Sequence, residues 1–272
     1  MSISRRLSYL IATLLAAGLL AGTGQAAAQP ACQPVLRIAL DEYGSYFFID
    51  ARHQMTGIDL EIANELARRL HCRPQIRVES VVRIMRLVAL GEIDMAMHKF
   101  VTEDRARIAW LTPYLREHNV ALVRKGGPPP GMAAFVDNPK WLLGAGTSWH
   151  LGTALYDDLV TRMRGQGRVM EAADTDQLYT LLRANRVQVI ITSAEVYRRQ
   201  LSREELAQYR IEDWNGNAPY PSLNVMLARA TVNEALATRV AAALQAMRAD
   251  GTLRRIVEKY VAPDEATGML NP

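Results

Sequence analysis

Polar and aromatic residues follow two short apolar runs in the first half of the chain. The runs are Val35–Leu40 and residues 93–97, and the groups that follow them are residues 41–46 and 98–102. Largely apolar runs of this length, here interrupted only by Arg37 and Asp94, are typical of buried strands in a parallel sheet. Ligands of such sheets bind beyond the C-terminal ends of the strands, so these two groups are candidate binding positions.

A third candidate position lies in the second half of the chain. Gly146, Thr147 and Ser148 predict a tight turn that caps a helix over about residues 149–163. The N-terminus of a helix favours a bound anion, because its first backbone N–H groups have no partner within the helix. Thr147 and Ser148 are therefore candidate anion contacts, or simply the cap of the helix.

Catalytic and metal-binding motifs are absent from the sequence. The histidines show neither HxxxH nor HExxH spacing, and neither GxSxG nor a Walker motif occurs. Glu195 and His98 have the chemistry of an acid or a base, but no spacing singles them out. We expect no enzymatic activity, no metal and no cofactor.

Helical and strand-like patterns alternate through residues 57–114. Ile58, Ile62, Leu66 and Leu70 recur every four residues on one helical face. A short alternating strand follows near residue 76, then a second helix that ends at Gly91, where a helix C-terminal glycine belongs. Strands that alternate with helices indicate a parallel sheet with helices on its faces, and thus an α/β fold.

The second half repeats this scheme after a Gly- and Pro-rich connector at residues 125–131. A strand at residues 118–124 is expected to lead into the connector. Beyond it we expect strands at residues 142–145, Val169–Ala172 and residues 187–192, and helices at residues 174–183 and 193–201. Residues 223–228 are expected to cross back to the first unit, where helices at 232–249 and 252–260 complete the fold.

Several segments together resemble the bacterial family 3 extracytoplasmic solute-binding proteins, the amino-acid-type binding proteins of ABC transporters. They are YGSYFFID (43–50), GIDLEIANELARRL (57–70), LVALGEIDMAM (87–97), VTEDR (101–105) and ALQAMRADGTLRRIVEKYV (243–261). The resemblance implies the type II periplasmic-binding-protein fold, with two mostly parallel sheets flanked by helices, joined by two crossing strands. The expected boundaries are a first lobe of residues 29–120 plus 226–272 and a second lobe of residues 121–225.

The resemblance also implies roles for individual residues. Arg105, in a Thr-x-x-Arg pattern, matches the arginine that pairs with the ligand's carboxylate, and its planar fork suits that geometry. Thr147 and Ser148 match the second-lobe position that contacts the same carboxylate. The aromatic loop that covers the ligand in relatives corresponds to Tyr43, Tyr46 and Phe48.

The sequence departs from the amino-acid-binding pattern in two places. His98 and Lys99 stand where relatives carry small residues, and Ser193 stands where they carry an aspartate for the ligand's ammonium. Either the ligand is more anionic than a zwitterion, or Lys99 fills the site with its own ammonium, or the loop points elsewhere. If the first holds, dicarboxylates and acidic amino acids outrank basic ones, unless Asp41 or Glu42 binds the ammonium of a basic ligand.

The N-terminus indicates export. Arg5 and Arg6 precede a short apolar run, and Ala26-Ala27-Ala28 forms a cleavage site, so residues 1–28 are interpreted as a signal peptide. The alternative is a lipoprotein acylated at Cys32, but the leucine expected three residues upstream is missing. A cleaved signal peptide predicts a soluble periplasmic protein.

The two cysteines, Cys32 and Cys72, lie just before the first and second expected strands. These strands can be parallel neighbours, and an oxidising compartment allows a disulfide. Such a bridge would stabilise the fold by roughly 3–4 kcal/mol on the entropic model. The alternative is a pair of unlinked buried thiols.

Composition agrees with a globular protein, with 49% hydrophobic and 22% charged residues. The formal net charge is +4, and removal of Arg5 and Arg6 with the signal peptide leaves +2. The arginines are scattered rather than concentrated in a patch, which argues against nucleic-acid binding.

The sequence thus predicts a monomeric binding protein that captures a small anionic or zwitterionic solute and passes it to the membrane permease of an ABC transporter. The alternatives are a ligand-sensing module for a membrane histidine kinase and a dehydratase on the same fold.

Overall fold

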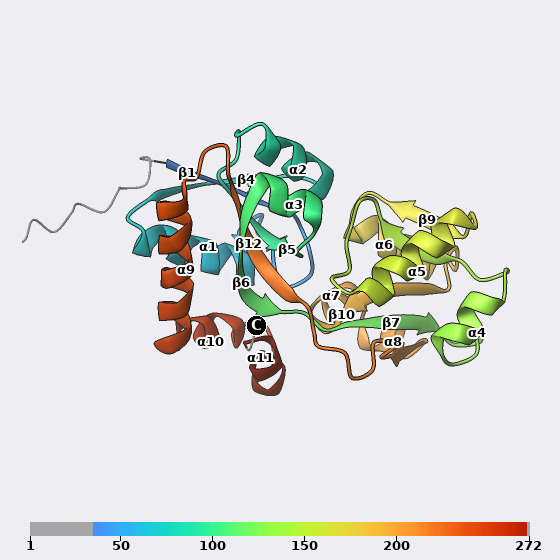
Figure 1. The fold of residues 1–272 in the computed structure, drawn as a ribbon. Coiled ribbons are helices and arrows are strands. Elements are labelled where there is room, and N and C mark those ends of the chain that lie inside the picture. The colour runs from blue at the N-terminus through green and yellow to red at the C-terminus, as the bar shows by residue number, and fades with distance from the viewer. Residues whose placement is uncertain (1–34, 271–272) are drawn as a thin grey trace, which may run out of the picture.

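Two five-stranded sheets organise the computed structural model, which describes residues 35–270 (Figure 1). In the sheet of the first lobe, β1 pairs in parallel with β4 and β5, whereas β12 is antiparallel to both of its neighbours, β5 and β6. The strands, in spatial order, are β4 (Arg73–Val78), β1 (Val35–Leu40), β5 (Met95–Lys99), β12 (Ser222–Ala228) and β6 (Ala109–Arg116).

The sheet of the second lobe has a similar mixture. Its strand β8 is parallel to β9 and β10, and β7 is antiparallel to β10 and β11. The spatial order is β11 (Tyr209–Glu212), β7 (Asn119–Arg124), β10 (Val189–Ser193), β8 (Leu143–Gly146) and β9 (Val169–Ala172). A two-stranded hairpin of β2 (Phe48–Ile49) and β3 (Met55–Thr56) extends the first lobe.

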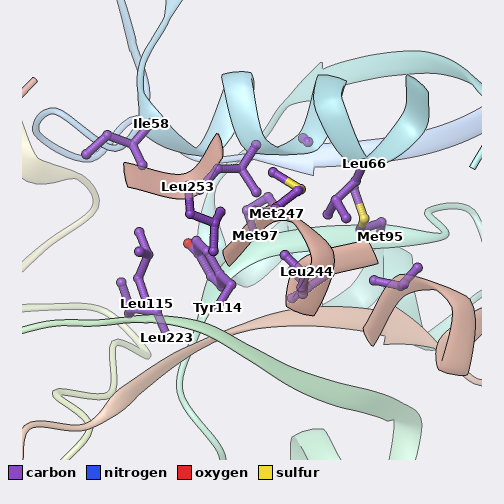
Figure 2. Packing of buried hydrophobic residues seen from close by; sticks show 14 of the residues in the cluster. Ile58, Leu66, Met95, Met97, Tyr114, Leu115, Leu223, Leu244, Met247 and Leu253 are labelled. Atoms are coloured by element: carbon purple, nitrogen blue, oxygen red, sulfur yellow. The ribbon is translucent and has the colours of Figure 1, made fainter. Parts of the chain in front are cut away.

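Helices cover both faces of the first sheet. Side chains of α1, α9, α10 and α11 form one core on one face, where Ile58, Leu66 and Met247 are fully buried (Figure 2). The side chains that recur every four residues in α1 therefore face the sheet, as predicted. On the other face α2 packs through Ile84 and Val88. The helices are α1 (Ile58–Arg69), α2 (Val81–Ala89), α3 (Glu103–Ile108), α9 (Glu234–Ala249), α10 (Thr252–Val257) and α11 (Pro263–Met269).

The second lobe is built in the same way, because alternate residues of its central strands face opposite sides. Ala121 and Val123 of β7 face the core that contains α4 and α5, whereas Val120 and Leu122 face α6 and α7. The helices are α4 (Met132–Asp137), α5 (Ala154–Gly165), α6 (Thr175–Arg183), α7 (Ala194–Gln200) and α8 (Arg203–Leu206).

The chain crosses between the lobes twice. Strand β6 ends at Arg116 in the first sheet, and β7 begins at Asn119 in the second, so Glu117 and His118 form the first crossing. The return crossing lies between β11 and β12, because β12 already belongs to the first sheet from Ser222. Both crossings fall a few residues before the boundaries expected from sequence, residues 120 and 225.

The predicted disulfide concerns one residue within the described part of the chain and one outside it. Cys72 immediately precedes β4, and Arg73 of β4 lies opposite Val35 of β1 in a parallel pair. The starts of the two strands are therefore adjacent, as the prediction requires. Cys32 and the predicted signal peptide, residues 1–28, lie outside the described residues, and the disulfide stays a prediction.

Candidate functional site

A cavity of about 40 Å³ lies between the lobes, at the C-terminal ends of β1 and β5. The first lobe contributes Asp41, Tyr43, His98, Lys99, Phe100 and Arg105, and the second contributes Trp149, His150 and Leu151. Glu117 of the first crossing and Asn119 at the start of β7 complete its polar wall. The position beyond the strand ends agrees with the expectation from the sequence.

The lobes touch each other around this cavity. Ser45 of the first lobe donates its backbone N–H to the carbonyl oxygen of Glu195 in the second lobe, at 3.0 Å. The rings of Tyr43 and Trp149 meet edge to face with their centroids 5.6 Å apart. These contacts therefore join residues of different lobes next to the cavity.

Arg105 is a buried arginine with unused donors. It lies in the first turn of α3, where Thr102 caps the helix by accepting the N–H of Arg105. Its side chain is nearly buried, and Nη1 donates to the carbonyl oxygen of Phe100 at 2.9 Å. Burial lowers the pKa of Arg105, although the charges of Asp41 and Asp157 oppose this. Among the described residues no carboxylate lies within 4.0 Å of the guanidinium, so its fork is available to a ligand.

Lys99 is also buried, but its charge is already neutralised. Its Nζ lies 2.6 Å from Oδ1 of Asp41, and its side chain is only 2% exposed. The pair forms because β1 and β5 are parallel neighbours, which brings the residues after each strand together. Lys99 thus lines the cavity as a neutralised ion pair, and whether its ammonium takes the place of a ligand's ammonium stays a prediction.

His98 lies between two buried carboxylates. Its Nδ1 is 3.6 Å from Asp59 Oδ2, and its Nε2 is 3.6 Å from Glu117 Oε2. Burial alone would lower the pKa of His98, but Glu117 and Asp59 outweigh it and raise the pKa to about 9. The imidazole is therefore a cation at neutral pH, held in place by both acids.

Asp59, one of the two acids beside His98, has a further partner. The hydroxyl of Tyr114 in β6 donates to Asp59 Oδ1 at 2.5 Å. Asp59 is 2% exposed, and it belongs to α1, whose packing fixes its position. The Asp59 carboxylate is thus satisfied within the first lobe and lies behind His98 rather than on the cavity wall.

Ser193 faces the crossing rather than the ligand cavity. Its hydroxyl donates to Glu117 Oε1 at 3.0 Å, and the residue is fully buried. Asn119 approaches the other oxygen of Glu117 through Nδ2 at 3.4 Å. Ser193 is therefore not among the residues that line the cavity, and its role as a ligand contact stays a prediction without support from this arrangement.

The three aromatic residues predicted to cover the ligand separate in the structure. Tyr43 lines the cavity, with its ring centroid 4.8 Å from that of His98. Tyr46 is fully buried against His98, with the ring centroids 4.3 Å apart. Phe48 lies away from the cavity, where the guanidinium of Arg199 stacks 3.2 Å above its ring. Only Tyr43 is positioned to contact a ligand in this cavity.

The predicted helix start at Thr147 and Ser148 is wrong. Helix α5 begins at Ala154 with Thr153 as its cap, and Thr147 and Ser148 are exposed residues of a turn outside the cavity. The helix starts late because Gly152 adopts a positive φ of 77°, which a continuous right-handed helix excludes. Thr147 and Ser148 therefore lack the helix N-terminus that made them candidate anion contacts.

The residues that follow this turn were missed by the sequence analysis. Trp149, His150 and Leu151 line the cavity instead. The indole of Trp149 packs against Gly146, where a Cβ would come within 2.0 Å of the ring. The pair Gly152-Thr153 was the available signal, since a glycine followed by a capping threonine marks a helix start.

Glu195 is a buried acid beside the first crossing. Burial and the charge of Glu117 raise the pKa of its carboxyl to about 7. Its Oε2 has no hydrogen-bond partner among the described residues, and Glu195 does not line the ligand cavity. Within residues 35–270 no group of three His, Cys, Asp or Glu residues is arranged to hold a metal ion.

The sequence matches one family model over residues 36–263, which spans both lobes and both crossings. The chain belongs to the bacterial extracellular solute-binding proteins, family 3. The predicted family and the two-lobe fold of this family are thereby confirmed. No curated protein matches the chain significantly.

Solved structures of similar fold come from proteins with different roles. One is a mutant of ArgBP from T. maritima, at TM-score 0.69 and 18% identity, covering 84% of this chain and 95% of that one. A histidine kinase sensor domain has TM-score 0.70 and 16% identity, covering 88% and 98%. An ancestral amino-acid-binding protein, described as a precursor of cyclohexadienyl dehydratase, has TM-score 0.69 and 18% identity, covering 84% and 95%. At these identities the likeness shows the fold alone.

Proposed function

We propose that this family 3 protein captures a small carboxylate-bearing solute between its lobes and delivers it to the permease of an ABC transporter. The observation that carries the proposal is Arg105. Its guanidinium lines the cavity between the lobes, is 5% exposed, and has no carboxylate of the described chain within 4.0 Å. A buried guanidinium without an anion is costly, and a ligand carboxylate would remove that cost.

Lobe closure supplies the coupling between binding and delivery. The cavity wall draws on both lobes and on the first crossing, so a bound solute would stabilise the closed arrangement over an open one. A partner that recognises the closed lobes would then distinguish loaded from empty protein. A monomer suffices for this role.

The test is a thermal-shift screen of the mature protein with small mono- and dicarboxylates and amino acids, followed by calorimetry of the hits. Because a ligand that binds only the folded state raises the melting temperature, a true ligand gives a concentration-dependent shift. Failure of all these compounds to shift the melting temperature would contradict the proposal.

Sensing is the second candidate, because the same fold occurs in a histidine kinase sensor domain. Ligand binding does not separate the two roles, but the partner does. Crosslinking of the loaded protein in membranes should capture a permease if it serves transport, and a kinase if it serves sensing.

Catalysis is not part of the proposal. His98 is held by two acids, and Glu195 does not line the cavity, so neither is a free acid or base next to a ligand. The ligand should therefore be recovered chemically unchanged after prolonged incubation, and a new product in its mass spectrum would contradict this.

Periplasmic location is also proposed, from the signal peptide at residues 1–28. The mass of protein isolated from the periplasm should correspond to a chain that begins at Gln29. After denaturation without reductant it should contain no titratable thiol if Cys32 and Cys72 are linked. A diacylglyceryl group on Cys32 would instead indicate a lipoprotein, and two titratable thiols would rule out the disulfide.

A further inference from the structure

The carboxylates of the cavity wall are already paired with groups of the protein. Of the residues that line the cavity, only Asp41 and Glu117 carry a carboxylate. Asp41 binds the ammonium of Lys99 at 2.6 Å. Glu117 accepts a hydrogen bond from Ser193 and lies 3.6 Å from the imidazole of His98. Oδ2 of Asp41 is not engaged by Lys99, but a ligand cation there would share one carboxylate with a buried ammonium.

The cation of the cavity wall that remains unpaired is Arg105. His98 and Lys99 each face an acid, whereas Arg105 donates only to the carbonyl oxygen of Phe100 among the described residues. Since Asp41 neutralises Lys99, the wall no longer offers the second cation that favoured a dicarboxylate. Lys99 is paired with Asp41, and the charge of His98 is shared between Glu117 and Asp59, so Arg105 is the cation of the wall that a ligand carboxylate could pair with.

The ammonium of an amino acid would find only a shared or a neutral acceptor on this wall, namely Oδ2 of Asp41 or the amide oxygen of Asn119. At Asp41 it would place a second cation beside the ammonium of Lys99, which is 2% exposed, with a single carboxylate for both charges. The rest of the wall is largely aromatic or aliphatic, with Tyr43, Phe100, Trp149 and Leu151. Such surfaces accept an apolar group and penalise an unpaired charge.

We propose that the cleft selects short-chain monocarboxylates that lack an amino group, with the carboxylate on Arg105 and with Lys99 occupying the place of the ligand's ammonium. This inference rests on the proposed function. The size of the cavity agrees with a short ligand, because one water needs about 10–15 Å³ and the cavity measures about 40 Å³.

Matched pairs of compounds test this proposal. Propionate, L-lactate and pyruvate are compared with L-alanine, and 4-methyl-2-oxopentanoate with L-leucine, by calorimetry on the mature protein. We expect each compound without an amino group to bind at least 10-fold more tightly than its amino acid. Equal or tighter binding of the amino acids would overturn this inference alone. Binding of neither series would overturn the proposed function, and this inference with it.

A pair of variants examines the role of Lys99. Lys99→Met leaves Asp41 without its cation. The affinity for amino acids should therefore rise at least 10-fold relative to the affinity for the matched compounds without an amino group. The double variant Asp41→Asn/Lys99→Met removes the pair together and should give amino acids no such gain. A merely destabilising change would weaken the binding of both series alike. An unchanged ratio between the affinities for the two series in Lys99→Met would therefore contradict the proposal. If Lys99→Met does not fold, the double variant still tests the proposal. A rise in the relative affinity for amino acids in the double variant would also contradict the proposal.

Discussion

The hydroxyl of Ser193, in the second lobe, donates a 3.0 Å hydrogen bond to Oε1 of Glu117 at the first crossing. Oε2 of the same carboxylate lies 3.6 Å from the imidazole of His98 in the first lobe. A single buried carboxylate thus links the ends of β10 and β5. The resemblance predicted that Ser193 takes the position of an aspartate that binds a ligand's ammonium, and in this structure its hydroxyl binds a carboxylate of the protein.

Replacement of Ser193 should therefore affect stability. Ser193→Ala removes a hydrogen bond to a buried charged acceptor, so we expect the free energy of unfolding to fall by about 1.5–3 kcal/mol. Urea denaturation measures this change. Thr238→Ala, at an exposed position of α9, is the control and should stay within about 0.5 kcal/mol of the parent. A loss for Ser193→Ala no larger than the control's would mean that this hydrogen bond contributes nothing.

Arg105 should determine affinity rather than fold. Arg105→Ala removes a charge-assisted pair with the ligand's carboxylate, which contributes about 1.5–3 kcal/mol, so affinity should fall roughly 10- to 150-fold. Arg105→Lys keeps the charge but loses the fork, and should recover only part of the affinity. Both are measured by calorimetry with a carboxylate found in the screen.

The neighbouring Arg107 offers a matched control. It lies on the same short helix, but its side chain is 69% exposed and pairs with Asp104. Arg107→Ala should bind the ligand as the parent does. Equal affinities of the parent and Arg105→Ala would show that the family role does not transfer to Arg105.

The sequence predicted the elements that depend on local periodicity. The four-residue spacing from Ile58 gave α1, and Gly91, just after the end of α2, indeed has a positive φ of 70°. These features are local, because side-chain spacing and backbone conformation are set by a few consecutive residues. The late start of α5 shows the limit, since Gly152 outweighed the apolar pattern that suggested a helix from residue 149.

The candidate site was less predictable, because its charges are paired by tertiary contacts. Lys99 and His98 were recognised as additional cations. Their partners, Asp41 and Glu117, lie far from them along the sequence. The pairing with Asp41 depends on β1 lying next to β5, which a single sequence does not specify. The sequence thus located the cations of the cleft and Asp41, but it identified neither Glu117 nor which of the charges remain unpaired.

His98 and Glu195 should make stability depend on pH. The pKa of His98 is about 9 in the folded protein and about 6.5 in the unfolded chain, so its contribution is complete below pH 6.5 and is lost as pH rises through 9. Its full extent is on the order of 3 kcal/mol. The pKa of Glu195 is raised from 4.5 to about 7, so the free energy of unfolding also falls as pH rises between these values.

Denaturation at a series of pH values measures both contributions. His98→Gln should flatten the profile between pH 6.5 and 9, because the titrating group is gone, and Glu195→Gln should flatten it between pH 4.5 and 7. The exposed His53 provides the control, and His53→Gln should leave the profile unchanged. A parent protein whose stability rises across both ranges would show that the sign is wrong.

Gly44 should control the closure of the lobes. It has a positive φ of 51°, and a Cβ at this position would lie 2.7 Å from the carbonyl oxygen of Glu195 and 2.7 Å from the Cα of Val196. Both atoms are backbone of the second lobe and cannot move aside without the lobe itself. Gly44→Ala should therefore hold the lobes apart and weaken ligand binding, because binding must then work against this contact.

The effect of closure can be separated from that of backbone strain. Gly126 also has a positive φ, of 76°, but a Cβ there would meet no atom within 4 Å, so Gly126→Ala carries the strain without the contact. Small-angle X-ray scattering with saturating ligand should show a larger radius of gyration for Gly44→Ala than for the parent. Gly126→Ala should match the parent in radius and affinity. If both variants lose affinity equally, strain rather than closure explains the loss, and the contact between Gly44 and Glu195 has no role in binding.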